Sequence, residues 1–298
     1  AARPRFELTA ANSEAVGQIV RRLDGIPLAI ELAAARVKLL SPAQIAGRLD
    51  DRFRLLTGGS RTALPRQQTL RALIDWSYDL LDEDECWFLR QMSVFAGGWT
   101  LEAAEYVVEA ANLRSLDALD LLANLVNKSL VRTDDSGDEV RYFYLETISQ
   151  YARDRLYEAG EGPRASDRHF AYFLQLAAEN YKDGELTTYA DQDRLTRLEN
   201  ELDNLRAAME WGAGLDPMAA IDLLRYLTAL WSARGLGEEA RRQAEMLLDS
   251  LAALPAAETK SAKGRLARAY GLAVFALGAG TTAAGDAAYT ALEDAIAI

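Results

Sequence analysis

The chain has 298 residues, a formal net charge of −12 and a hydrophobic content of one half. This length exceeds the roughly 100–200 residues of a single domain, which predicts two or three compact units. The lone cysteine, Cys86, excludes an intramolecular disulfide and is interpreted as a packing residue. No run approaches the roughly 18 apolar residues of a membrane-spanning helix.

Charge and the start of the chain give three further expectations. Residues 1–80 carry 12 Lys/Arg and 8 Asp/Glu, whereas residues 81–298 carry 21 and 37, so most of the chain is predicted to repel nucleic acid. The start has neither an initiator Met nor the apolar region of a signal peptide. We therefore predict a cytoplasmic location and a piece of a longer protein.

The first region reads as helices joined by a tight corner. Apolar residues at helical spacing predict a helix over residues 12–23, with Asn12 as its N-cap. Gly25 suits the left-handed position after a helix, and Pro27 suits the first turn of the next one. Residues 28–40 are nearly apolar all round, so we expect this helix to be buried on more than one side.

A short third helix and a linker are predicted to follow. Ser41 and Gln44 have the spacing of a capping box, which opens a helix through Leu49. Residues 51–65 are rich in Arg, Gly and Thr and are interpreted as a linker, whose arginines have a solvated or intramolecular role by default. The first predicted domain is therefore a helical domain at residues 1–58.

The second predicted domain, residues 66–160, has the element order of a winged helix. Helices are followed by two alternating strands around an Asp- and Gly-rich turn, which is typical of a β-hairpin. The predicted helices span 66–81, 82 to the Gly97-Gly98 pair, 100–110 and 115–127, and the predicted strands span 129–133 and 140–144.

Residues 163–298 are predicted to be helical throughout and to repeat loosely. Residues 223–231 resemble residues 267–277 at an offset of about 43–44 residues. Helix pairs at such a period suggest a solenoid, although tetratricopeptide units are shorter, at roughly 34 residues. The predicted fold class is all-α with one small β-hairpin: a helical lid domain, a winged helix and a tetratricopeptide-like α-solenoid.

Four sequence phrases resemble one protein class in the same order. Residues 24–34, with Gly25 and Pro27, resemble the GxP motif of the STAND signal-transduction ATPases. This class contains plant NB-ARC proteins and bacterial transcriptional regulators of the AfsR-like and large LuxR-like types. The resemblance continues at residues 52–59 with 69–71 and 75–81, at 93–98, and at 145–148 with 151–152.

The resemblance implies a nucleotide lid. In this class the helical domain closes over the nucleotide base, which places Gly25, Pro27 and Leu28 on the adenine side, and the winged helix holds the ADP-bound protein shut. A rigid proline ring offers adenine a flat apolar surface. The alternative reading of Gly25 and Pro27 is a simple helix corner.

The sensor position departs from the plant pattern. Where the plant proteins carry Met-His-Asp at the end of the wing, the matching positions are Tyr144, Leu145 and Glu146. Without a His, ADP sensing by that contact is not expected. Glu146 is left as the sensor-position residue, with the alternative role of an acid at a helix N-terminus.

The chain lacks the motifs of nucleotide hydrolysis. It has no GxxxxGKS/T loop and no apolar strand ending in paired acids, so the phosphate cradle and the magnesium ligands are missing. We expect this chain not to be an enzyme and to hold no cofactor or metal alone. ATP or ADP with Mg is expected in a parent ATPase, whose upstream P-loop domain would be a partner.

The resemblance favours the regulatory and sensor portion of a signal-responsive transcriptional regulator, with an inducer or protein bound at the repeats and an oligomer of the active parent. Four aromatic residues could line a concave binding surface, although core packing is the alternative for them: Tyr226, Trp231, Tyr270 and Phe275. A second reading is a protein-binding helical-repeat scaffold without a nucleotide role.

A third reading, DNA binding through the winged helix, conflicts with charge. Residues 115–127 contain Asp117 and Asp120 but no Lys or Arg, and the wing tip is also acidic. We therefore predict no direct DNA binding by this chain. His169 is interpreted as a surface or packing residue, and the run at residues 199–203 as the acidic face of a helix.

Overall fold

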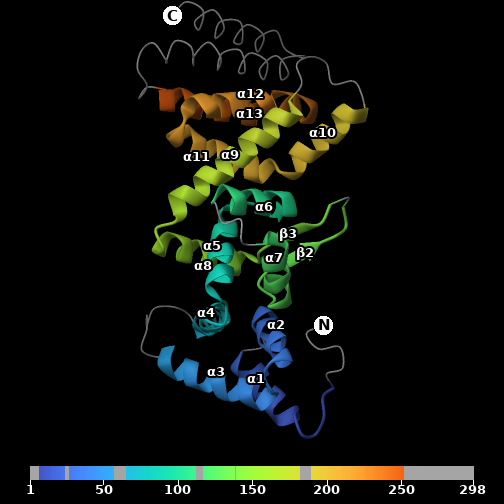
Figure 1. Ribbon diagram of the computed structural model, residues 1–298, viewed down its shortest axis with the longest axis vertical. Coiled ribbons are helices and arrows are strands. Elements are labelled where there is room, and N and C mark those ends of the chain that lie inside the picture. Colours follow the sequence, from blue (N-terminus) through green and yellow to red (C-terminus); the bar gives the residue numbers. More distant parts are fainter. Residues whose placement is uncertain are drawn as a thin grey trace, which may run out of the picture. The chain divides into compact units, whose positions relative to one another are not determined.

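The computed structural model describes residues 7–23, 27–56, 65–111, 117–137, 139–181 and 189–251 (Figure 1). The chain divides into two compact units, Ala1–Ser93 with Gly98–Gly162, and Val94–Gly97 with Pro163–Ile298. It is mostly helical with a small antiparallel sheet, which confirms the predicted fold class. The finer domain boundaries at 1–58, 66–160 and 163–298 stay predictions. Within the described ranges, no helix is long and apolar enough to cross a membrane.

The first unit begins with helices α1 (Ser13–Arg22), α2 (Pro27–Ala35) and α3 (Pro42–Leu56), with the 3-10 turn η1 (Arg36–Lys38) before α3. Pro27 opens α2 as predicted, whereas Gly25 lies outside the described residues. The capping box before α3 is confirmed, because the Ser41 backbone N–H donates to Gln44 Oε1 at 2.9 Å and the Gln44 N–H to Ser41 Oγ at 3.3 Å.

Three expectations for this region were wrong. Asn12 precedes α1, but its side chain bonds backward along the chain, to the Thr9 N–H and the Glu7 carbonyl, and does not cap the helix. The third helix does not end at Leu49 but continues to Leu56, into the predicted linker. The second helix does not continue to residue 40: α2 ends at Ala35, and Leu39 beyond it is 79% exposed, although much of α2 itself is buried as expected. Its buried residues are Ala29, Leu32, Ala33 and Ala35.

The middle of the first unit follows the order of a winged helix. The helices are α4 (Pro65–Tyr78), α5 (Glu83–Gln91), α6 (Leu101–Ala110), α7 (Ala118–Asn127) and α8 (Glu146–Glu158), with the 3-10 turn η2 (Met92–Val94) after α5. The strands are β1 (Trp99–Thr100), β2 (Arg132–Asp134) and β3 (Arg141–Phe143), which form an antiparallel sheet in the order β1-β3-β2. The hairpin β2–β3 was predicted, but β1 was not.

Strand β1 depends on the two glycines before it. Gly97 and Gly98 have φ values of 81° and 96°, which side-chain-bearing residues rarely adopt. They turn the chain so that Trp99 pairs with Tyr142 and Thr100 with Arg141. A strand of two residues offers no alternation to detect in the sequence, so only the Gly-Gly pair marked a change of direction.

The described part of the second unit contains α9 (Gly162–Asn180), α10 (Tyr189–Asn200), α11 (Leu202–Leu215), α12 (Pro217–Arg234) and α13 (Gly237–Leu251). Helix α12 packs against α10, α11 and α13, and its Leu227, Leu230 and Trp231 are buried. The second copy of the suspected repeat, residues 267–277, lies outside the described residues.

The predicted acidic helix face at residues 199–203 was wrong. Glu201 interrupts the helical pattern between α10 and α11 and is only 6% exposed. Its carboxylate accepts a hydrogen bond from Asn204 Nδ2 at 2.7 Å, whereas Glu199 and Asp203 form ion pairs with Arg234 and Arg206. Glu201 is therefore a buried polar group that is satisfied within the core.

Candidate functional site

Helix α7 is the helix that precedes the wing, at the position of a recognition helix. One face packs against α5 and α6 through Ala118, Leu121, Leu122 and Leu125, all buried. The opposite face is exposed and carries Asp120, Ala123, Asn124 and Asn127. Since Asn is a side chain that can read adenine in the major groove, this face has a chemistry suited to base contacts.

The acids of α7 do not share one role. Asp117 is the N-cap, and its Oδ1 accepts from the N–H groups of Leu119 at 2.8 Å and Asp120 at 3.2 Å. The Asp117 carboxylate is thus engaged in capping the helix N-terminus. Asp120 is the single acid within the ten residues of α7.

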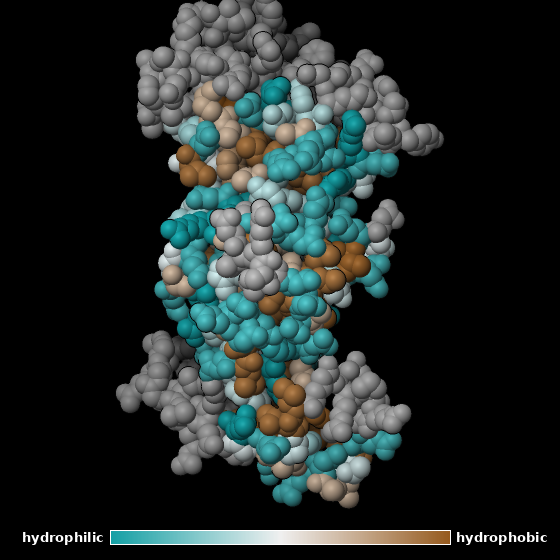
Figure 2. Space-filling view, viewed as in Figure 1, coloured by the Kyte–Doolittle hydropathy of each residue, from teal (hydrophilic) through white to brown (hydrophobic). Residues whose placement is uncertain are grey.

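The wing carries charges of both signs. Arg132, Asp134, Asp135 and Glu139 are exposed around the turn between β2 and β3. Hydrogen bonds from Ser136 lower the pKa of Asp134, so this carboxylate stays charged at neutral pH. On the face shown in Figure 2, the first unit presents mostly hydrophilic side chains, with hydrophobic ones in small groups.

A buried ion pair lies where α7 ends. The Glu85 carboxylate on α5 pairs with the ammonium of Lys128, and the two side chains are 3% and 23% exposed. Glu85 also closes the capping box of α5: its Oε2 accepts from the Asp82 N–H at 3.0 Å, while its own N–H donates to Asp82 Oδ1 at 2.8 Å. One carboxylate therefore fixes the start of α5 and the end of α7.

Two of the segments that carry the family resemblance, residues 75–81 and 151–152, contribute to a second polar cluster. Tyr151 Oη donates to Asp75 Oδ1 at 2.7 Å, and Arg155 bonds to both groups, at 2.8 Å to the carboxylate and 3.0 Å to the hydroxyl. Burial, followed by the bond with Asp75, raises the pKa of Tyr151. The cluster ties α4 to α8.

At the predicted sensor position, Tyr144 is held by a hydrogen bond and Glu146 lies at the start of a helix. Burial raises the pKa of Tyr144 well above its ordinary value, and its hydroxyl donates to the Leu89 carbonyl at 2.9 Å. Glu146 is exposed in the first turn of α8, which fits the N-terminal acid reading. On the lid, Pro27 is exposed, and Leu28 follows it in the first turn of α2.

The predicted partner-binding aromatics fall into three groups. Trp231 is 1% exposed and belongs to the helical core, so its ring is not available to a partner in this structure. Tyr226 is half-buried beside Tyr181, at 5.0 Å between ring centroids, with the Arg225 guanidinium over both rings. Tyr270 and Phe275 lie outside the described residues.

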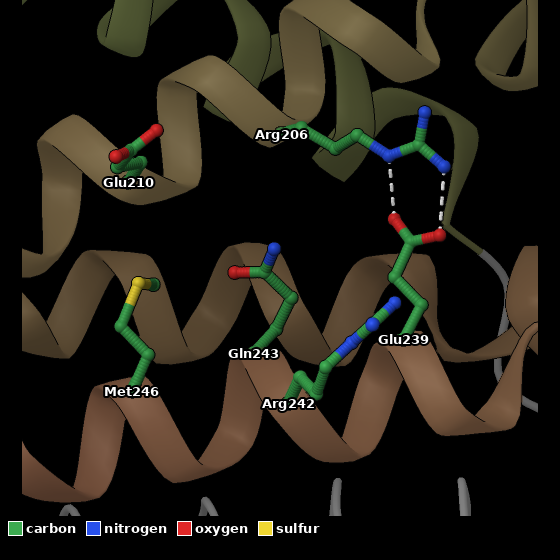
Figure 3. Close-up of a pocket in the computed structure, with 6 residues that line it drawn as sticks. All are labelled: Arg206, Glu210, Glu239, Arg242, Gln243 and Met246. Carbon is green, nitrogen blue, oxygen red and sulfur yellow. Dashed lines mark hydrogen bonds and ion pairs between the residues drawn. The ribbon is translucent and has the colours of Figure 1, made fainter.

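A cavity of about 540 Å³ between α11 and α13 was not anticipated from the sequence (Figure 3). Arg206 and Glu239 close one end with a bidentate ion pair, at 2.6 and 2.7 Å. Gln243 Oε1 is buried without a hydrogen-bond partner. The lining residues include side chains of both charges, one amide and one apolar side chain: Arg206, Glu210, Glu239, Arg242, Gln243 and Met246.

His169 is a buried packing residue. It is 3% exposed, its ring lies 4.6 Å from that of Phe173 and 5.2 Å from that of Phe95, and its Nε2 is 3.4 Å from Asn204 Oδ1. Burial lowers its pKa to about 4, against 6.5 ordinarily. The unfolded chain therefore takes up this proton first as the pH falls, and stability is lost as the pH drops below 6.5.

We expect the wild-type chain to lose roughly 2 kcal/mol more unfolding free energy than His169→Phe between pH 7.5 and pH 5. The variant keeps an aromatic ring but has no titrating group, so carboxylates common to both proteins cancel in the difference. Urea denaturation at both pH values measures it. Equal losses in the two proteins would show that His169 is not buried in its neutral form.

Comparison with known proteins identifies the middle of the chain. Residues 81–157 match the model of the winged helix-turn-helix domain. Over 235 residues, which are 78% of this chain, it is 46% identical to "Putative HTH-type transcriptional regulator Rv0890c" of Mycobacterium tuberculosis. The same identity and coverage hold for "Putative HTH-type transcriptional regulator Mb0914c" of Mycobacterium bovis. "Uncharacterized protein Rv0894" of Mycobacterium tuberculosis is 39% identical over 174 residues, which is 58% of this chain and 44% of that protein.

The chain spans about a quarter of the length of the two regulators, 26%. The domain match and the regulators contradict the prediction that this chain does not bind DNA directly, since both point toward DNA binding. That prediction weighed the acids of residues 115–127 and of the wing tip, but Asp117 serves as the N-cap of α7, which leaves Asp120 as the acid on the exposed face of this helix. The chain thus carries a winged helix-turn-helix domain within a mostly helical protein similar to HTH-type regulators.

Proposed function

We propose that this chain is the winged-helix and regulatory portion of a transcriptional regulator, and that α7 contacts DNA. The observation that carries the proposal is the element order α5-β1-α6-α7-β2-β3, with an exposed Asn-bearing face on the helix before the wing. The similarity to HTH-type regulators over 78% of the chain supports it.

The charges on α7 and the wing determine whether DNA would be bound mainly through its phosphates or through its bases. Asp120 on α7 and the wing acids Asp134, Asp135 and Glu139 oppose phosphate, and Arg132 is the exposed cation nearest to them in the sequence. Few phosphates would be neutralised, so affinity would depend weakly on salt. Base contacts from Asn124 would then supply a larger share of the binding energy than in a basic domain.

Selection from random DNA duplexes tests this proposal. The 298-residue chain is expected to enrich a short motif at low salt, and Asn124→Ala is expected to lose the enrichment. Gln150→Ala, which removes an exposed amide from α8, is the matched control and is expected to enrich the same motif. Failure of the wild-type chain to enrich any motif would count against DNA contact by α7.

We also propose that the parent is a STAND ATPase of the NB-ARC type, AfsR-like or large LuxR-like, in which residues 1–58 close over the nucleotide. The motif phrases and the exposed Pro27 at the start of α2 support this role. The described residues contain no group of three or more His, Cys, Asp or Glu suited to a metal ion. Phosphate binding, Mg binding and ATP hydrolysis would belong to the upstream domain, because the sequence of this chain has no GxxxxGKS/T loop.

For the lid we expect Pro27→Ala to weaken ADP binding about five-fold in a protein extended upstream to include the phosphate-binding loop. The substitution removes the flat apolar ring, and alanine keeps the helix start. Calorimetry with ADP on both proteins measures the change. Unchanged affinity, with wild-type folding by circular dichroism, would remove Pro27 from the adenine site.

The second unit would act as the sensor. The cavity between α11 and α13 offers Arg242 to an anionic group, Glu210 to a cationic one and the unpaired Gln243 Oε1 to a donor. A zwitterionic inducer with a small apolar part would suit this lining. Its binding would shift the equilibrium between a closed and an open regulator.

A further inference from the structure

The connecting segment Val94–Gly97 belongs to a different compact unit from its neighbours in the sequence. It lies between α5 and β1, inside the winged helix-turn-helix domain, but its contacts place it in the second unit. Ser93 and Gly98 on either side belong to the first unit. The chain therefore leaves the first unit, contributes to the second, and returns.

The segment is held by specific contacts in the second unit. The Ala96 backbone N–H donates to Asn204 Oδ1 at 2.7 Å. Phe95 is 5% exposed, and its ring makes edge contacts with His169 and Phe173 at centroid distances of 5.2 and 6.0 Å. These contacts come from α9 and α11, which carry the aromatic residues and Asn204.

Asn204 is itself fixed by its surroundings. It is 1% exposed, its Nδ2 donates to the Glu201 carboxylate at 2.7 Å, and its Oδ1 lies 3.4 Å from His169 Nε2. A buried polar network of this kind is costly to break, because each released group loses a partner out of reach of water. Movement of α11 relative to α9 would therefore act on the Ala96 N–H.

The residues on either side of the segment, Ser93 and Gly98, are also held in place, by contacts within the first unit. The Ser93 carbonyl accepts from the Arg153 guanidinium, at 3.2 Å to Nη2. A β-carbon on Gly98 would lie 2.7 Å from the Tyr142 carbonyl oxygen, so the backbones of the strand start and β3 are in close approach. The next residue, Trp99, pairs with Tyr142. Because the residues directly before and after the segment are held in this way, the backbone has little freedom to absorb a displacement of the segment.

We propose that the connecting segment mechanically couples the helical second unit to the wing. A rearrangement of α9 and α11 that releases Phe95 and the Ala96 N–H loosens the pairing of β1 with β3, and a change at the wing acts back on the helices. The biological purpose rests on the proposed regulatory function. The coupling itself is a property of the chain and is testable without DNA, nucleotide or inducer.

Hydrogen exchange of the 298-residue chain, followed by mass spectrometry, tests the coupling. Asn204→Ala removes the acceptor of the Ala96 N–H, and Phe95→Leu removes the ring contacts while keeping an apolar side chain. Each is expected to raise exchange about five-fold in peptides that contain β1 and β3, which neither substitution touches. Rates are compared at a temperature where all variants keep the wild-type circular dichroism.

Trp211→Phe is the matched control. Trp211 lies on α11 and its Nε1 donates to Asp167 Oδ1 on α9 at 2.9 Å, so the variant loses one hydrogen bond between the same helices without touching the segment. Its strands are expected to exchange at the wild-type rate. The coupling is refuted by unchanged strand exchange in Asn204→Ala and Phe95→Leu, or by equal acceleration in Trp211→Phe. Absent DNA binding would leave this result unaffected.

Discussion

Gly98→Ala is expected to lower the unfolding free energy of the winged helix-turn-helix domain by roughly 3–5 kcal/mol. Two costs add. Its φ of 96° is one that alanine rarely adopts, and the new β-carbon would lie 2.7 Å from the Tyr142 carbonyl oxygen, a backbone atom that cannot rotate away. Relief requires the start of β1 to move off β3.

Thermal and urea denaturation of both proteins measure this loss. Gly47→Ala is the control in the same unit: Gly47 lies within α3, and its β-carbon would meet nothing within 4 Å. That variant is expected to gain roughly 0.5–1 kcal/mol, because alanine is the better helix former. A Gly98→Ala protein as stable as the wild type would show that β1 does not approach β3 as described.

Lys128→Met is expected to cost roughly 3 kcal/mol, because it leaves the Glu85 carboxylate buried without its cation. The methionine side chain preserves much of the packing of the lysine stem. The loss should appear in the whole winged helix-turn-helix domain, since Glu85 holds the first turn of α5 and Lys128 follows α7.

A double-mutant cycle separates the ion pair from packing. Glu85→Gln keeps an oxygen that can accept from the Asp82 N–H, as Glu85 does at 3.0 Å, but removes the charge. In this background Lys128→Met is expected to cost less than about 1 kcal/mol. An equal cost in both backgrounds would assign the effect to packing and leave the pair without a stabilising role.

Local features were predictable where one short stretch decides them. Pro27 opens α2, and Ser41 with Gln44 caps α3, because a fixed φ and a capping spacing act within a single turn of helix. The wing strands followed from alternation around an Asp- and Gly-rich turn. The capping preference of Asn12 failed because the same side chain found backbone partners earlier in the chain.

The features that were missed depend on residues far apart in the sequence. Glu201 has a charged side chain but is buried, and its partner Asn204 also receives the Ala96 N–H from 108 residues away. Strand β1 exists only because β3 is present to pair with it. No periodicity within one segment records such pairings, although the Gly97-Gly98 turn marked the place.

The candidate DNA interface shows the same limit. The acids of residues 115–127 and of the wing tip predicted repulsion, but a count of acids could not tell that Asp117 faces the helix N-terminus or that Glu85 engages Lys128. Both facts concern which acids remain available to a partner. The position of α7 before the wing follows from the order of the elements, which the sequence did indicate.

The most direct test of DNA recognition through α7 is fluorescence anisotropy of the chain on an enriched duplex, for wild type, Asn124→Ala and Gln150→Ala across a salt series. We predict that Asn124→Ala binds about ten-fold more weakly, that Gln150→Ala matches the wild type, and that affinity falls only shallowly with salt. Equal binding by Asn124→Ala, or no binding by the wild type at low salt, would contradict DNA recognition through α7.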